Sequence, residues 1–212
     1  MSKKDLGVKP YTFPMPTLMI GTYNEDNSVD VMMMAWGGIC AEDMVALNLE
    51  ESHKTVENLR KRKAFTLAVP SVETMEASDF FGIASSNKMP DKFQRSGLHA
   101  VKSNKVDAPV ISEYPLTMEC TVEKFEEEPY GLRILGRIVN VLADTSVLDE
   151  KGKVDAGKLH AFAFDQMCSG YYAVTEKVGQ AWNAGAKLMK KGSIINVGVL
   201  WTFTFTKPHI VI

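Results

Sequence analysis

Short apolar runs separated by polar turns follow one another along most of the chain. Residues 17–22 and 29–34 are apolar runs on either side of the turn-rich stretch 24–28, a pattern typical of a β-hairpin. Residues 44–50 alternate between apolar and polar side chains, as a half-buried strand does, and residues 64–70 form another apolar run that ends at a proline. We therefore expect strands at each of these runs.

The middle of the chain predicts a long antiparallel hairpin. Residues 116–128 alternate clearly between apolar and polar side chains, and residues 132–144 continue the pattern after a turn at 129–131. Gly136 interrupts the second strand, where a glycine indicates a bulge or the close approach of another group.

Helical signals are fewer. Ser52 precedes a segment in which Val56 and Leu59 share one face, so we expect a short helix with Ser52 as its N-cap, ending by Lys63. Residues 71–85 carry the 3.6-residue spacing of a second helix.

The last third of the chain is more varied. Residues 148–160 are polar and rich in glycine, which predicts a loop with one helical turn; residues 171–186 predict a strand followed by a helix; and residues 194–212 predict a strand. Six or more short strands with two or three helices favour a mainly β fold, a barrel or sandwich, over a parallel sheet. No repeat or low-complexity linker divides the chain, so residues 1–212 are expected to form a single domain.

Composition excludes several function classes. The formal net charge of -2 leaves no broad basic field for nucleic acid or an anionic membrane. The N-terminal residues contain no apolar stretch, so we expect neither a signal peptide nor a membrane anchor. The three cysteines, Cys40, Cys120 and Cys168, are widely spaced, which favours reduced thiols in a cytoplasmic protein over a disulfide scaffold.

Common catalytic motifs are missing from the sequence. It contains no GxGxxG, GxxxxGK[ST], HExxH or GxSxG, and its four histidines are scattered singly. A Rossmann domain and a metal site are therefore not expected, and no catalytic side chain is assigned.

Two polar segments have the chemistry of a phosphate site. Lys54, the Thr55 hydroxyl and free N–H groups at a helix start would together bind a phosphomonoester, although this segment alone is better explained by a Ser52 cap and a solvated lysine. Residues 81–93 gather serines and lysines around a glycine, with Phe93 available to a flat ring.

In order and spacing, residues 14–38, 52–70, 81–93, 108–122, 135–141 and 171–179 resemble the flavin reductase-like family, particularly its flavoredoxin branch. The resemblance implies an FMN-binding split β-barrel of Greek-key topology. It also implies a homodimer with the flavin near the subunit interface. Residues 187–212 extend beyond the match and are expected to be a C-terminal extension.

The resemblance also implies which residues bind FMN. A strand end should border the isoalloxazine, a helix start and a loop should hold the phosphate and ribityl groups, and two aromatic residues should line the ring or the substrate space. Asp30 stands where relatives often carry asparagine, so its contact stays open. The strand end comprises Met32, Met33, Ala35 and Trp36. The helix start and the loop comprise Ser52, Lys54, Thr55, Ser85, Ser86, Lys88 and Lys92, and the two aromatic residues are Phe164 and Tyr172.

The expected function is that of an FMN-dependent oxidoreductase, either a flavin reductase or a flavoredoxin-like electron carrier. Many relatives that use NAD(P)H carry a histidine in the turn of the long hairpin, whereas this chain has Pro129, Tyr130 and Gly131 there, which allows a redox protein as the donor instead. A non-enzymatic FMN-binding module for storage or sensing and a pyridoxamine-phosphate oxidase relative are the alternatives.

Overall fold

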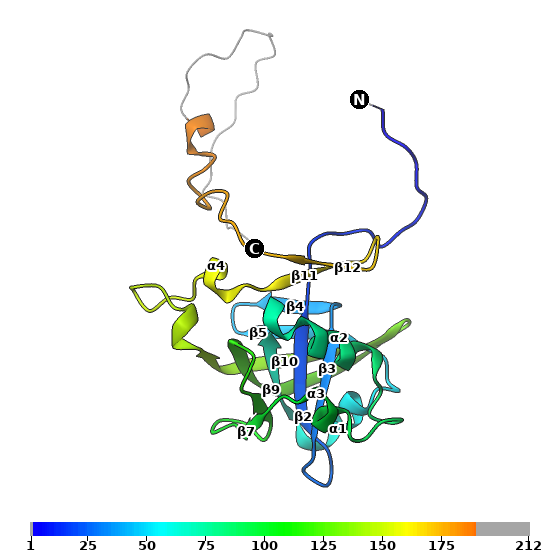
Figure 1. Ribbon diagram of the computed structural model, residues 1–212. Coiled ribbons are helices and arrows are strands. Elements are labelled where there is room, and N and C mark those ends of the chain that lie inside the picture. Colours follow the sequence, from blue (N-terminus) through cyan, green and yellow to red (C-terminus); the bar gives the residue numbers. More distant parts are fainter. Residues whose placement is uncertain (1, 190–212) are drawn as a thin grey trace. The chain divides into compact units, whose positions relative to one another are not determined.

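A seven-stranded antiparallel sheet forms the centre of the fold in the computed structural model, which describes residues 2–189 (Figure 1). The strand order is β3-β2-β6-β9-β10-β5-β4. Their bounds are β2 Leu18–Tyr23, β3 Val29–Met34, β4 Gly37–Ala41, β5 Met44–Leu49, β6 Ala64–Val69, β9 Leu116–Glu128 and β10 Gly131–Ala143.

Smaller elements surround this sheet. Two further sheets pair β1 (Met15–Pro16), β11 (Phe162–Asp165) and β12 (Gly170–Ala173), and β7 (Ala100–Lys102) with β8 (Pro109–Ile111). The helices are α1 Lys54–Arg62, α2 Met75–Ile83, α3 Lys92–Ser96 and α4 Ala156–Leu159, with 3-10 turns η1 Val72–Thr74, η2 Thr145–Val147 and η3 Ala186–Met189. No helix within residues 2–189 is long and apolar enough to cross a membrane.

The strand β2 begins with three apolar residues and is buried up to Thr22 because both of its faces are covered. Leu18 and Ile20 belong to the main core, whereas Met19 belongs to a second core that includes Phe81 of α2 and Phe93 of α3. Figure 1 shows α2 and α3 beside β3, on the side of this second core. The helices thereby bring the 81–93 segment next to the end of β3.

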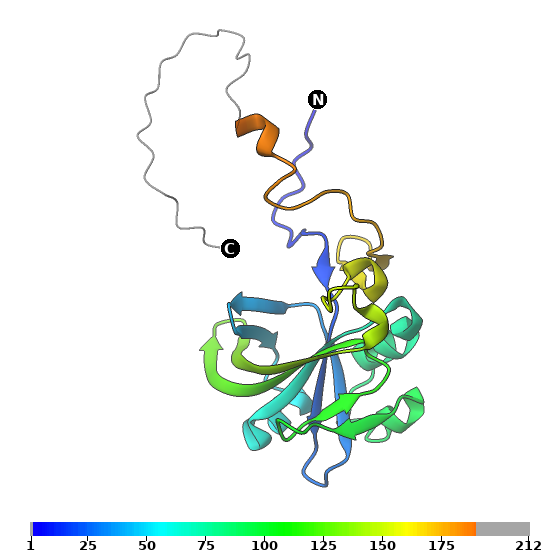
Figure 2. The same ribbon diagram turned by 90° about the vertical axis from the view of Figure 1, so that its left-hand side faces the viewer.

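Two residues connect the opposite edges of the large sheet. The strands β3 and β4 lie at the two ends of the strand order, yet only Ala35 and Trp36 separate them in sequence. Because two extended residues span roughly 7 Å, the sheet must curl until its edges approach each other. Figure 2 shows this curvature along the β9–β10 hairpin.

The predicted irregularity at Gly136 is confirmed. The β9–β10 pairing shifts register between Leu135 and Gly136, and a Cβ atom on Gly136 would lie 2.5 Å from Cζ of Phe65. The glycine therefore both marks a bulge, which increases local twist, and makes room for a core aromatic ring.

The start of α1 differs from the prediction. The helix begins at Lys54, and its N-cap is His53 rather than Ser52, with φ -70 and ψ 136 and no side-chain cap hydrogen bond. Ser52 lies one residue too early for its hydroxyl to reach the first helical N–H groups. The expected end is confirmed, since Lys63 caps the helix in the left-handed conformation with φ 55.

The predicted helix within residues 171–186 is wrong. The strand β12 forms as expected, but beyond it the described residues contain turns and only the short η3 at Ala186–Met189. Val178 and Trp182 are 99% and 83% exposed, so among the described residues these apolar side chains make little of the packing that stabilises a short helix. Residues 177–189 belong to a second unit of the chain. The predicted strand at 194–212, and all but the first three residues of the predicted extension at 187–212, lie outside the described residues.

Candidate functional site

Three segments that are distant in sequence meet at the carboxylate of Asp30, on β3. Oγ1 of Thr55 donates a hydrogen bond to Oδ2 of Asp30 at 2.8 Å, and Nζ of Lys92 lies 3.1 Å from Oδ1. The Ser86 hydroxyl also donates to Oδ1. The start of β3, the start of α1 and the 81–93 segment are therefore brought together, four residues before the end of β3 that was predicted to border the ring.

This network is almost completely buried. The exposed fractions are 0% for Asp30, 2% for Thr55 and 3% for Lys92. A buried carboxylate requires a cation and several donors, which the three partners supply. Because the hydroxyl of Thr55 and the ammonium group of Lys92 bind Asp30 inside the protein, these residues hold the start of α1 and the 81–93 segment in place.

A second contact links the same two segments on the surface. Nδ2 of Asn87 donates to the carbonyl oxygen of Ser52 at 3.0 Å. Ser85 and Lys88 are exposed on this loop, next to Ser86. These polar groups lie where a ligand could reach them.

The start of α1 has the properties of an anion site. The helix has nine residues and no side-chain cap, so its first backbone N–H groups are available to an acceptor. Lys54 forms an ion pair with Glu57 at 2.8 Å, and this contact lowers the pKa of the Glu57 carboxyl. Exposed pairs of this kind contribute little stability, so Lys54 is free to exchange Glu57 for a bound anion.

A pocket of about 720 Å³ lies beside the α1 start. Its size falls within the usual range for small-molecule sites. It contains all four residues expected to border the ring, and we call it the ring pocket. Its lining residues are Met32, Met33, Met34, Ala35, Trp36, Asn48, Leu49, Glu50, His53, Glu128, Tyr130, Gly131, Leu132 and Arg133.

Two buried nitrogen atoms of the ring pocket have no hydrogen-bond partner among the described residues. They are Nδ1 of His53 and Nε of Arg133. Leaving a buried polar atom unpaired is costly, so its presence in a pocket indicates that a ligand completes the bonding. A flat heterocycle with nitrogen and carbonyl groups on its edge fits this set of donors and apolar side chains.

Neither Arg133 nor His53 was identified from the sequence as a binding residue. The signal available was the unusual turn at residues 129–131, whose tip the structure places at the ring pocket through Tyr130 and Gly131. Arg133 lies two residues beyond this turn and pairs with Asn48 of β5 in the sheet.

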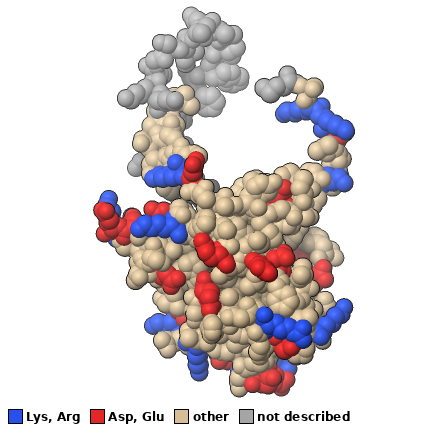
Figure 3. Space-filling model, in the orientation of Figure 1, with Lys and Arg blue, Asp and Glu red and all other residues tan. Residues whose placement is uncertain are grey.

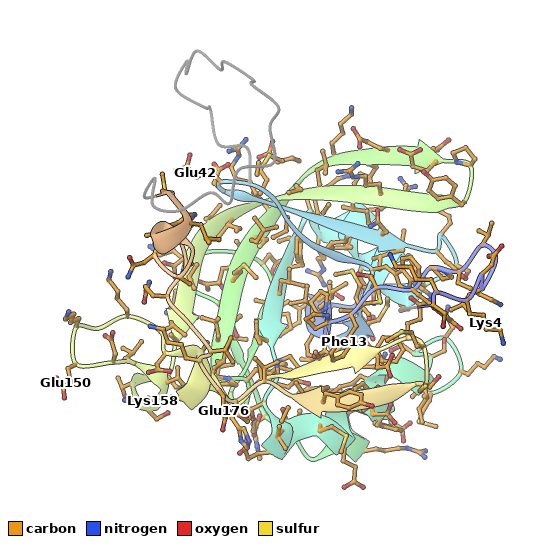
Figure 4. The ribbon with its side chains drawn as sticks, turned by 90° about the horizontal axis from the view of Figure 1, so that it is seen from above. Lys4, Phe13, Glu42, Glu150, Lys158 and Glu176 are labelled. Carbon is orange, nitrogen blue, oxygen red and sulfur yellow. The ribbon has the colours of Figure 1, made fainter. Side chains whose placement is uncertain are left out.

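Phe164 and Tyr172 lie in the sheet of β1, β11 and β12, which contacts the pocket residue Met33 through the hydroxyl of Tyr171. Tyr172 packs edge-on against Phe13 with ring centroids 5.4 Å apart, and Figure 4 shows Phe13 next to β11 and β12. Neither Phe164 nor Tyr172 is among the described residues that line the ring pocket. Their neighbour Tyr171 donates to Asp79 of α2 at 2.7 Å, which ties this sheet to the helix.

A second, larger groove of about 1270 Å³ carries none of the expected site residues. It lies between α2, the end of α3 and α4, and Figure 3 shows several acidic side chains on the face that carries α2 and α4. On its rim, hydrogen bonds from Ser71 and His160 lower the pKa of Glu73 to about 2. Within residues 2–189, no group of three or more His, Cys, Asp or Glu side chains could hold a metal.

Comparison with protein families now decides the relationship. The model of the family described as "Flavin reductase like domain" matches residues 11–163. The chain belongs to the flavin reductase-like family. The matched range includes the Asp30 network and the whole ring pocket, so the expected membership is confirmed.

Solved structures agree with this assignment. The chain is 33% identical to the flavoredoxin of Desulfovibrio vulgaris (Miyazaki F), with a TM-score of 0.82 over 87% of this chain and 100% of that one. The flavoredoxin of Methanosarcina acetivorans is 22% identical, with a TM-score of 0.80 over 89% and 100% of the two chains. A split barrel domain protein of Shewanella frigidimarina NCIMB 400 is 16% identical, with a TM-score of 0.71 over 79% and 86%. The predicted mainly β, split-barrel fold is confirmed.

Proposed function

We propose that this flavin reductase-like protein is an FMN-dependent oxidoreductase, acting as a flavin reductase or as a flavoredoxin-like electron carrier. The observation that carries the proposal is the meeting of Thr55, Ser86 and Lys92 at Asp30, beside a pocket that contains the expected ring-binding residues. The family membership and the likeness to two flavoredoxins support the same function.

The proposed site divides into two parts. Met32, Met33, Ala35 and Trp36 would border the isoalloxazine in the ring pocket, where Trp36 is half exposed. Lys54 and the backbone N–H groups at the α1 start would hold the phosphate, with Ser85 and Lys88 on the adjoining loop. The hydroxyls of Thr55 and Ser86 donate to Asp30 and position these two segments. Ser52 would contribute through the loop contact that its carbonyl accepts from Asn87.

Flavin supplies the hydride and electron chemistry, and the protein supplies binding, orientation and electrostatics. Asp30 and Lys92 act as positioning residues, because they fix the loop and the helix start without reaching the surface. Phe164 and Tyr172 would line substrate space beside the ring, because their sheet approaches the ring pocket through Tyr171, whose hydroxyl lies 3.9 Å from Sδ of Met33.

We further propose a cytoplasmic homodimer with FMN near the subunit interface. Trp36 and Ile39 are 50% and 65% exposed at one edge of the sheet, which provides apolar surface for a second copy. The electron donor is NAD(P)H or a redox protein, and the turn at residues 129–131 favours the latter because it lacks the histidine found in many NAD(P)H-using relatives.

Flavin titration tests the proposal. Purified protein should bind FMN with a changed visible spectrum, and it should bind FMN more tightly than riboflavin because the phosphate is recognised. Failure to bind any flavin would overturn the assignment.

Turnover separates the remaining alternatives. Steady-state oxidation of NADH or NADPH with added FMN, or reduction of the bound flavin by a reduced ferredoxin-type protein, identifies an oxidoreductase. Tight FMN without either reaction would indicate a binding module for storage or sensing. Production of pyridoxal phosphate would instead indicate a pyridoxamine-phosphate oxidase.

A further inference from the structure

We propose that Arg133 raises the reduction potential of the bound flavin by placing its guanidinium against the acceptor edge of the ring. This inference rests on the proposed function, since it concerns the same pocket. It concerns a residue that neither the sequence resemblance nor the phosphate network had indicated.

Arg133 has an unsatisfied donor in the ring pocket. Its Nε is buried and makes no hydrogen bond to any described residue, although the side chain as a whole is 43% exposed. The nearest carboxylate oxygen, Oε2 of Glu126, is 3.9 Å from Nε, which is too far for a hydrogen bond. The donor therefore awaits an acceptor from a ligand.

The charge of Arg133 is also poorly compensated. Glu126 is bound more closely by Lys124, whose Nζ lies 2.8 Å from Oε1, and this contact lowers the pKa of Glu126. The other carboxylates of the pocket, Glu50 and Glu128, are both exposed to solvent, which screens their charge. The partly buried guanidinium of Arg133 is therefore the charge that acts most strongly on a ligand in the ring pocket.

Such a charge distinguishes the two redox states of a flavin. A flavin that takes two electrons and one proton from a donor gains one negative charge, which is shared between N1 and the neighbouring carbonyl. A fixed cation near that charge stabilises the reduced state more than the oxidised one. The effect is larger in a pocket from which the ligand displaces water.

His53 contributes a second unpaired nitrogen to the same pocket. It is the N-cap of α1, so its backbone is anchored while Nδ1 stays free in the part of the chain that the structure describes. A ring bonded at both Arg133 and His53 would be fixed in orientation, and its tail would lie toward the α1 start.

The test compares Arg133→Met with Arg137→Met. Arg137 lies on the same strand and is paired with Glu123 and Asp43 on the surface, so its loss changes the net charge equally without touching the ring pocket. The measurements are the dissociation constants of oxidised and dithionite-reduced FMN, and the midpoint potential of bound FMN against a reference dye.

We expect Arg133→Met to weaken the binding of reduced FMN about tenfold more than that of oxidised FMN, which equals a fall of about 30 mV in the two-electron potential. Arg137→Met should leave the potential at the wild-type value. Arg133→Lys, which keeps the charge, should restore most of the shift. Equal potentials in wild type and Arg133→Met would overturn the inference.

The outcomes are separable from those of the proposed function. Wild-type protein that binds no flavin would remove the function itself, whereas flavin binding with an unchanged potential would remove only the role of Arg133. If Arg133→Met fails to fold, Arg133→Gln provides the same loss of charge with a polar side chain, and the same comparison of potentials applies.

Discussion

Nζ of Lys92 lies 3.1 Å from Oδ1 of Asp30, and both side chains are almost completely removed from solvent. Lys92 also donates to the carbonyl oxygen of Ala84 at 3.3 Å. The ammonium group thus connects β3, the end of α2 and the start of α3 at one point. Because a charge buried this deeply requires its partner, the position of the loop before α3 depends on this pair.

Removing one member of the pair should destabilise the protein strongly. Lys92→Met leaves the carboxylate of Asp30 buried without its cation, which typically costs about 3–5 kcal/mol in the free energy of unfolding. Urea unfolding followed by circular dichroism measures it. The control is Arg95→Met, which removes an exposed pair with Asp91 and should cost under about 1 kcal/mol.

The double variant Asp30→Asn/Lys92→Met removes both charges and should recover part of this loss. If the loss of unfolding free energy in the double variant equals the sum of the losses in Asp30→Asn and Lys92→Met, the two groups act independently.

Weakened phosphate binding is expected from Lys54→Ala, which leaves the buried hydrogen bond between Thr55 and Asp30 intact. A charge-assisted hydrogen bond contributes roughly 1.5–3 kcal/mol, so FMN affinity should fall by about that amount, while riboflavin affinity changes little. Isothermal titration calorimetry measures both. Lys61→Ala, on the same helix and paired with Glu25 and Glu57, provides the matched control. An unchanged FMN dissociation constant would exclude Lys54 from the phosphate site.

The free energy of unfolding should fall at alkaline pH because of the buried Tyr114. Burial raises its pKa from 10 to about 12, so the stability it contributes is fully present below pH 10 and is lost as the pH rises to 12. Two pKa units correspond to about 2–3 kcal/mol. Tyr114→Phe should therefore lose less stability than wild type between pH 9 and pH 11.5 in urea unfolding. Tyr130→Phe, at an exposed position, should behave as wild type; equal slopes for all three proteins would contradict the expectation.

Gly136→Ala tests the close packing of the long hairpin. Its new methyl group would lie 2.5 Å from the Phe65 ring, and overpacking of this kind costs about 1–3 kcal/mol. Thermal unfolding should show a lower midpoint. Gly185→Ala, where a Cβ meets nothing within 4 Å, should change stability by less than about 0.5 kcal/mol. Similar midpoints for both variants would show that Phe65 moves aside freely.

Thiol reactivity depends on burial. Cys40 and Cys168 are exposed, whereas Cys120 is buried, and desolvation raises the pKa of the Cys120 thiol to about 12. A thiolate is the reactive form, so Cys120 should not react at pH 8 in the folded protein. Titration with a chromogenic disulfide should count two thiols before unfolding and three afterwards. Three reactive thiols in the native state would be inconsistent with the packing of β9.

Local patterns were sufficient to predict the hairpins. The turn at residues 24–28 and the break at 129–131 separate strands where the structure has them, and the isolated Gly136 correctly indicated a bulge. These features depend on residues adjacent in sequence, so the sequence carries them directly. The short helix α3 was missed because its five residues lie within a polar segment with no helical period.

The binding site was only partly predictable. The resemblance grouped the ends of β3 and α1 with the 81–93 segment, but it could not show that Asp30 would take up the donors of Thr55 and Lys92. The unpaired nitrogen of Arg133 arises from the packing of the β9–β10 hairpin against β5, which no local pattern encodes. Phe164 and Tyr172 were expected from the resemblance, which does not determine how the sheet of β11 and β12 docks beside the pocket.

The short link made by Ala35 and Trp36 has a mechanical consequence. It joins the two edge strands of the sheet, β3 and β4, along a line that we call the seam. The backbone amide of Asn48 on β5 donates to the Trp36 carbonyl at 2.9 Å, so the link is also held to β5. The ring pocket is built on this seam. A ligand bound there would contact both edges of the sheet. Its binding should therefore slow the local opening of β3 and β4 together, including at backbone amides that it does not contact.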